Sequence, residues 1–153
     1  MRALRIPLAG LLAFALASAS ALAEGEGDKA PPKERATKDD YELDLAATSP
    51  ELKVGDSGTF SLVIRAKNGT KIHPQAPLEV KLKDGPGLKV EKQKLGRGDI
   101  ANKGDAAPDL RTALKALAAG THTVEADVSF FLCTDAWCQR MSDRVSVGIK
   151  IAE

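Results

Sequence analysis

Beyond residue 40, apolar and polar residues alternate along most of the chain. A period of two predicts strands that bury one face and expose the other, as in antiparallel sheets. The clearest run is 124–130, where apolar side chains alternate with acidic and hydroxyl side chains. Five further segments share the pattern: 41–45, 58–66, 77–83, 87–95 and 145–151.

Turn-forming residues separate these segments. Glycine stands in each of four intervening stretches, beside aspartate, asparagine or proline in most of them: 54–56, 68–69, 84–87 and 119–120. These residue types favour tight turns because they tolerate, or pre-set, the backbone angles that a turn requires. Short strands separated by such turns predict an all-β domain, a two-sheet antiparallel β-sandwich.

The first 23 residues have the three parts of a secretory signal peptide. Arg2 and Arg5 provide a positive start, residues 7–16 form an apolar run too short to span a bilayer, and residues 21–23 (Ala-Leu-Ala) suit a signal peptidase. Residues 1–23 are therefore predicted to be removed on export, with an uncleaved anchor as the alternative. No later stretch is apolar enough to cross a membrane.

Residues 24–40 are charged, rich in glycine and proline, and without an apolar period. Such a composition cannot bury a face, so a disordered linker is predicted there, followed by a single folded domain at 41–153. The signal peptide holds two basic residues and no acidic ones, so its removal changes the net charge from +1 to −1. This charge excludes the basic surface expected of a nucleic-acid-binding domain.

Two cysteines, Cys133 and Cys138, carry the most distinctive chemistry of the chain. In an exported protein two nearby cysteines are expected to form a disulfide, and two thiols are too few for a structural zinc site. Four residues separate them, so a four-residue hairpin would place them directly opposite each other. The alternation of the flanking segments then puts both on the outer, wetter face of the sheet.

Two roles are open for this predicted disulfide. As a hairpin staple it would add about 2 kcal/mol of stability for a loop of about six residues. As a redox-active pair it would exchange with a partner's thiols, which requires an accessible sulfur. Phe131 and Trp137 would then form an exposed apolar patch where the partner docks. Asp135, Arg140 and Arg144 have opposing charges, which leaves their net effect on a thiolate open.

His73, His122 and Met141 are weaker candidates. His73 is expected to be a polar loop residue rather than a ligand, and His122 a solvated residue at the start of a strand. Met141 could join Cys133 and Cys138, as reduced thiols, in a soft copper site. No catalytic triad, phosphate-binding loop or pair of carboxylates stands out, and no cofactor or metal is predicted.

Three blocks of sequence carry a resemblance to a known family: residues 59–64 with 71–77, residues 86–92, and residues 119–124 leading to 130–138. They resemble the amino-terminal, immunoglobulin-like domain of DsbD-type thiol:disulfide interchange proteins and its stand-alone bacterial relatives. The resemblance covers about residues 41–152, and the cysteine hairpin is its most specific part.

The resemblance implies a periplasmic immunoglobulin-like β-sandwich of about seven strands. It also implies that Cys133 and Cys138 correspond to redox cysteines that pass electrons to thioredoxin-like partners. DsbD-type domains have five residues between these cysteines, whereas this chain has four. The first hypothesis is an exported, periplasmic or secreted, domain that takes part in thiol–disulfide exchange through Cys133 and Cys138. The alternative is a non-catalytic binding or structural module whose disulfide only stabilises the fold.

One segment fits two secondary structures. Asp109 as N-cap, an apolar stripe at helical spacing and a terminal Gly120 would suit a helix. Leu110, Thr112 and Leu114 would also share one face of a strand, although the local pattern alone slightly favours the helix. The sandwich context and the resemblance favour the strand.

Overall fold

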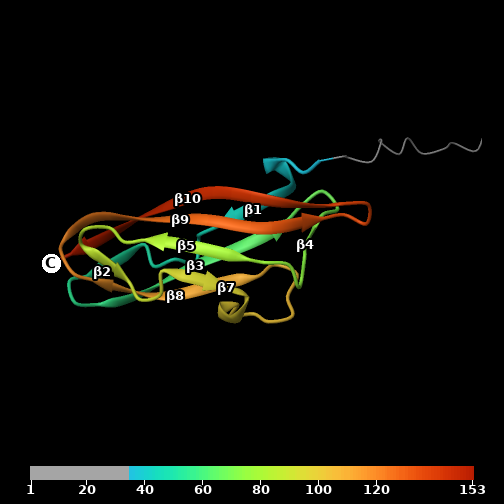
Figure 1. Cartoon of the computed structure of the whole chain (residues 1–153). Coiled ribbons are helices and arrows are strands. Elements are labelled where there is room, and N and C mark those ends of the chain that lie inside the picture. Colours follow the sequence, from blue (N-terminus) through green and yellow to red (C-terminus); the bar gives the residue numbers. More distant parts are fainter. Residues whose placement is uncertain (1–34) are drawn as a thin grey trace, which may run out of the picture. The chain divides into compact units, whose positions relative to one another are not determined.

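The computed structural model describes residues 35–153, which form a two-layer β-sandwich (Figure 1). This arrangement confirms the all-β sandwich predicted from the alternating pattern. The predicted signal peptide and residues 24–34 of the predicted linker lie outside the described residues. Within the described part of the chain, no helix has the length and apolar character needed to cross a membrane.

The described residues form ten strands and two short 3-10 helices. The strands are β1 (Tyr41–Asp44), β2 (Glu51–Lys53), β3 (Ser57–Ala66), β4 (Lys71–Ile72), β5 (Glu79–Lys83), β6 (Leu88–Val90), β7 (Lys94–Gly96), β8 (Asp109–Ala116), β9 (Gly120–Cys133) and β10 (Cys138–Ala152), and the helices are η1 (Lys38–Asp40) and η2 (Arg97–Asp99). The count exceeds the predicted seven because four strands have only two or three residues, too few to show a clear alternation.

One sheet has the order β1-β3-β8-β6, and the other has the order β2-β10-β9-β5-β7, with β4 paired to the far end of β9. The pairings between strands are antiparallel except that of β2 with the end of β10, which is parallel. The chain therefore changes sheets between β1 and β2, and one parallel pair interrupts the predicted antiparallel pattern.

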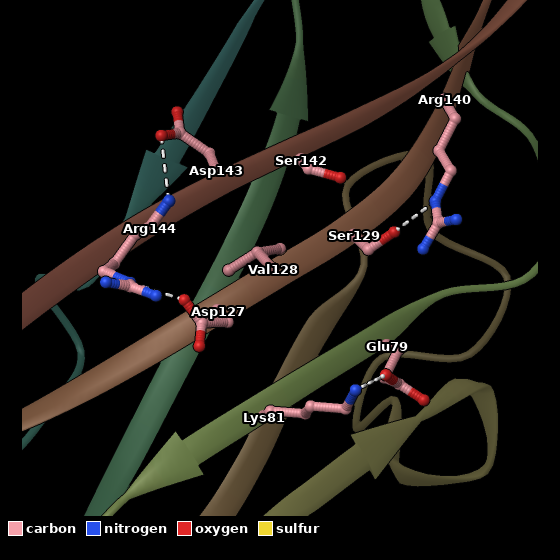
Figure 2. A pocket seen from close by; sticks show the side chains of 9 residues that line it. All are labelled: Glu79, Lys81, Asp127, Val128, Ser129, Arg140, Ser142, Asp143 and Arg144. Atoms are coloured by element: carbon pink, nitrogen blue, oxygen red, sulfur yellow. Dashed lines mark hydrogen bonds and ion pairs between the residues drawn. The ribbon is translucent and has the colours of Figure 1, made fainter.

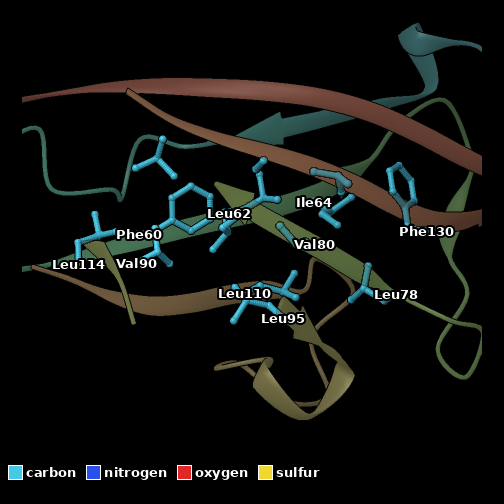
Figure 3. Close-up of a cluster of buried hydrophobic side chains, with 14 of the residues drawn as sticks. Phe60, Leu62, Ile64, Leu78, Val80, Val90, Leu95, Leu110, Leu114 and Phe130 are labelled. Atoms are coloured by element: carbon cyan, nitrogen blue, oxygen red, sulfur yellow. The ribbon is translucent and has the colours of Figure 1, made fainter. Parts of the chain in front are cut away.

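The core lies between the two sheets. Phe60 and Leu62 of β3 belong to the same buried cluster as Val80 of β5 and Phe130 of β9 (Figure 3). The ring of Tyr41 meets that of Phe130 edge-on, with 5.1 Å between the ring centres. Burial of each large apolar side chain contributes about 1.5–3 kcal/mol, so the alternating positions predicted from the sequence supply most of the driving force.

The segment with two possible structures is a strand. In β8, Leu110, Thr112, Leu114 and Ala116 are buried and the residues between them are exposed. The strand pairs with β3 on one side and β6 on the other. The local pattern alone slightly favours a helix, so this pairing on both edges decides the conformation.

Residues 35–40, predicted to be disordered, belong to the folded domain. Ala36 and Asp40 are buried, and η1 covers the last three residues of the segment. The Asp40 carboxylate accepts hydrogen bonds from the backbone N–H of Thr37 at 2.7 Å and from the side-chain amide of Asn68 at 3.2 Å. Buried charge is tolerated when it is hydrogen-bonded in this way. The polar composition of residues 35–40 did not reveal that they are ordered, because one hydrogen-bond donor to Asp40 is Asn68, far along the chain.

A Cβ atom at Gly87 would force the imidazole ring of His122 to move. His122 is half-buried rather than solvated: Nδ1 accepts a hydrogen bond from the Gly87 N–H at 3.2 Å, and Nε2 lies 3.0 Å from the carbonyl oxygen of Ala118. A Cβ atom at position 87 would lie 2.2 Å from Nε2 of His122. We therefore expect Gly87→Ala to lower the free energy of unfolding by about 1–3 kcal/mol in urea titrations of the oxidised protein.

Gly98→Ala provides the matched control for this prediction. No atom lies within 4 Å of the position that a Cβ would occupy at Gly98. Its free energy of unfolding is expected to change by less than about 0.5 kcal/mol. Equal losses in the two variants would contradict the importance of the contact with His122.

Candidate functional site

The two cysteines close the hairpin between β9 and β10. Cys138 lies directly opposite Cys133 in the register of the two strands, and the residues form a disulfide with 4.1 Å between their Cα atoms. The predicted pairing and the predicted four-residue connection are both confirmed. The hairpin lies at the end of the longest pair of strands in the described residues (Figure 1).

Thr134 organises the loop between the cysteines. Its backbone N–H donates to the carbonyl oxygen of Trp137 at 2.8 Å, and its hydroxyl oxygen accepts from the N–H groups of Ala136 and Trp137 at 3.2 and 3.3 Å. Since hydrogen-bonded pairs alternate along an antiparallel ladder, the neighbouring cysteines form a pair without mutual backbone bonds. Side chains approach most closely at such pairs, which favours the disulfide.

The two cysteines differ in solvent exposure. Only 1% of Cys133 is exposed, whereas Cys138 is an exposed residue. Both cysteines belong to the outward-facing set of residues, as the alternation predicted. Cys133 is nevertheless buried, so the expectation that both cysteines lie on a wet face is wrong for Cys133. The short strand β4 pairs with the end of β9 and places Lys71 opposite Cys133, so Cys133 is flanked on both sides. A reagent in solution therefore meets Cys138 first.

A lysine residue lies opposite the buried cysteine. Directly opposed residues of an antiparallel pair have Cβ atoms about 4.5–5.5 Å apart, so Lys71 of β4 lies next to Cys133. The Lys71 ammonium group is 2.9 Å from the carboxylate of Asp135 in the hairpin loop, and this hydrogen bond lowers the pKa of Asp135. The positive charge of Lys71 therefore lies at Asp135 of the hairpin loop, two residues along the chain from Cys133.

Phe131 and Trp137 do not form the exposed patch that was predicted for partner docking. Both are half-buried, and Trp137 packs against the hydrophobic core. Phe131 lies two residues before Cys133, on the same outer face of the sheet, and opposite Arg140 of β10. The two aromatic residues therefore have different surroundings, and their role in docking stays a prediction.

The copper-site hypothesis does not gain a third ligand from Met141. Met141 lies opposite Phe130 in the β9–β10 register, is only 8% exposed and belongs to the core cluster. Its side chain is therefore on the opposite face of the sheet from Cys138. Among residues 35–153, no group of three histidine, cysteine, aspartate or glutamate residues is arranged to hold a metal ion.

His73 has a structural role in the loop after β4. Its Nδ1 accepts hydrogen bonds from the backbone N–H groups of Gln75 at 3.1 Å and Ala76 at 2.9 Å. The Arg97 guanidinium donates hydrogen bonds to the carbonyl oxygens of His73 and Ala76. These bonds hold the loop, in agreement with the expectation that His73 is a loop residue.

A charged groove of about 430 Å³ lies on the outer face of β5, β9 and β10 (Figure 2). Its lining includes Glu79, whose pKa is lowered to about 2 by hydrogen bonds from Lys94 and then Lys81. The pKa of Asp127 is lowered as well, chiefly by its hydrogen bond from Arg144. Both carboxylates therefore stay ionised and neutralise neighbouring cations. The sequence alone did not reveal this groove because it combines strands that are distant in the chain.

No protein-family model and none of the curated proteins matches this chain. Among solved structures, it is similar to domains 4 and 5 of the S-layer protein SbsC, with 13% identity and a TM-score of 0.44 over 73% of this chain and 51% of that one. It is also similar to native alpha-2-macroglobulin of E. coli, with 14% identity and a TM-score of 0.47 over 73% of this chain and 7% of that one. A third similar structure is AggA, the major subunit of an aggregative adherence fimbria of E. coli, with 17% identity and a TM-score of 0.38 over 77% and 99%.

The chain thus spans about half of the SbsC fragment and a small part of alpha-2-macroglobulin. At these identities and TM-scores the likeness bears on neither the site nor its chemistry.

The difference in exposure predicts a difference in reactivity. After mild reduction, iodoacetamide is expected to modify Cys138 about tenfold or more faster than Cys133, because reaction at Cys133 requires local opening of β4 or the hairpin. Peptide mass spectrometry over a time course measures the two rates. In urea the two rates should become similar, and comparable rates in the folded protein would contradict the assigned burial.

Proposed function

We propose that this protein is an exported, periplasmic domain that takes part in thiol–disulfide exchange with a thioredoxin-like partner through Cys133 and Cys138. The observation that carries the proposal is the unequal exposure of the two cysteines in one disulfide. Exchange requires one sulfur that a partner can reach and one that can leave, and the unequal exposure supports the first role for Cys138 and the second for Cys133. The signal-like residues 1–23 support an oxidising compartment, where such disulfides form and persist.

The reaction begins at the exposed cysteine. A thiolate of the partner attacks Sγ of Cys138, the bond between the two sulfurs breaks, and Cys133 leaves as a thiolate that takes a proton from solvent. The partner is then joined to Cys138 as a mixed disulfide. The partner's second thiolate attacks its own sulfur in that bond and releases Cys138. The partner dithiol is oxidised by two electrons and the domain disulfide is reduced, and the same steps run backwards transfer electrons to the partner.

Two effects oppose each other at Cys133. Burial disfavours its thiolate, which makes it a poor leaving group, whereas the positive charge of Lys71, the residue opposite it, stabilises the charge that develops there. In the oxidised protein Lys71 is held by Asp135. We infer that this lysine offsets part of the burial penalty during exchange.

Replacing the lysine tests this inference. Lys71→Met is expected to slow reduction of the disulfide by dithiothreitol about three- to tenfold, the range expected for loss of a partly screened charge interaction. Asp135→Asn provides the control: it breaks the same ion pair but leaves the cation, so the rate should stay constant or rise. Equal slowing in the two variants would show that the ion pair acts only by holding the loop.

A mixed disulfide tests the exchange itself. The probe is a thioredoxin that retains only its exposed cysteine, activated as a mixed disulfide with thionitrobenzoate. The Cys133→Ser variant should displace the thionitrobenzoate through Cys138 and accumulate a covalent adduct, because no second cysteine can resolve it. Cys138→Ser should react about tenfold or more slowly, since its remaining thiol is buried. Absence of an adduct with Cys133→Ser would overturn the proposal.

The second candidate is a binding or structural module in which the disulfide is only a staple. The observation that favours it is the burial of Cys133 between β4 and β10, which hinders its departure. In that case both single variants would lose about 2 kcal/mol of stability, and Cys133→Ser would react with the activated thioredoxin no faster than with thionitrobenzoate-activated glutathione. The rate of adduct formation with thioredoxin relative to glutathione thus separates the two functions.

A further inference from the structure

The outer face of the β9–β10 ladder presents a series of cross-strand pairs that begins at the disulfide. In order from the hairpin end, these pairs are Cys133–Cys138, Phe131–Arg140, Ser129–Ser142 and Asp127–Arg144. Successive pairs on one face are two residues apart, about 6.8 Å along the strand. The pair next to the disulfide therefore combines a half-buried aromatic ring with an exposed guanidinium group.

Arg140 differs from the other arginine on this face. Arg144 forms an ion pair with Asp127 (Figure 2), in which Nε of the arginine is 2.5 Å from the carboxylate. Arg140 instead donates from Nε to the hydroxyl oxygen of Ser129 at 2.9 Å, and no carboxylate of residues 35–153 lies within ion-pair distance of it. Its two terminal amino groups retain donors for an incoming acceptor.

We propose that the Phe131–Arg140 pair recognises an acidic side chain that lies two residues from the reactive cysteine of the exchange partner. This inference rests on the proposed function and adds to it the chemistry that the partner must present. Arg140 supplies the charge that the carboxylate complements, and the groove beyond it, along β10, accommodates the rest of an extended segment.

The spacing follows from strand geometry. An extended partner segment that places its cysteine against Cys138 and runs along β10 brings a residue two positions away against Arg140, because both strands advance by the same distance per residue. Guanidinium groups bind carboxylates through two parallel hydrogen bonds, which adds geometric selectivity. Phe131, opposite Arg140, offers its ring to the apolar stem of that side chain.

The test uses ten-residue peptides with one cysteine, flanked two residues before and two residues after by glutamate or, in the matched peptide, by glutamine. Excess peptide reduces the oxidised protein, and the fluorescence of Trp137, the single tryptophan of the chain and a neighbour of Cys138 in sequence, reports the rate. Rates are measured for the natural sequence and for Arg140→Gln. Because glutamate also changes the reactivity of the peptide thiol, the informative quantity is the double-mutant cycle of the four rates.

We expect the ratio of the glutamate-peptide rate to the glutamine-peptide rate to be about two- to fivefold larger in the natural sequence than in Arg140→Gln at low ionic strength. This difference should disappear in high salt, as for an exposed ion pair. Arg65→Gln, in the other sheet and paired with Asp44, controls for net charge and should show no coupling with the peptide. Equal rate ratios in the natural sequence and Arg140→Gln would overturn the recognition while leaving exchange intact. If neither peptides nor dithiothreitol reduce the disulfide, the proposed function fails and this inference with it.

Discussion

The antiparallel pairing of β9 with β10 is the constraint on which the fold and the site both depend. Fourteen residue pairs, from Gly120–Ile151 to Cys133–Cys138, fix a single register along these two strands. That register sends one set of side chains into the core and the other set outward. A slip of one residue would move the cysteines apart and bring the apolar residues of β10 to the surface, so packing and disulfide formation select the same alignment.

Much of this alignment is visible in the sequence. Two features of the sequence predict that the cysteines lie opposite each other. The alternation in β9 and β10 and the four residues between the cysteines each imply the same register. The burial of Cys133 was not predictable, since it depends on β4, a strand of two residues that has no detectable period. The order of residues 35–40 was hidden for a related reason: the amide that binds Asp40 comes from Asn68. Pairing with β3 and β6 likewise decided the conformation of β8.

The same short strand shapes the chemistry of the disulfide. β4 pairs beside Cys133, which is buried, while Cys138 is exposed. In the proposed exchange, Cys138 is therefore the residue that a partner reaches first, and Lys71 of β4 lies opposite the cysteine that would leave. Burial alone would favour an inert staple, because a buried thiolate is costly. A cation near that sulfur would lower this cost. The balance between the two effects determines whether the bond is structural or exchangeable.

The reduction potential of the Cys133–Cys138 disulfide measures this balance most directly. It is obtained by equilibrating the protein without residues 1–23 in glutathione redox buffers and quantifying the oxidised fraction by thiol alkylation. Exchange predicts a potential well above about −300 mV, in the range of exchangeable protein disulfides. A potential below about −300 mV, typical of structural disulfides, would contradict the account and identify the bond as a staple.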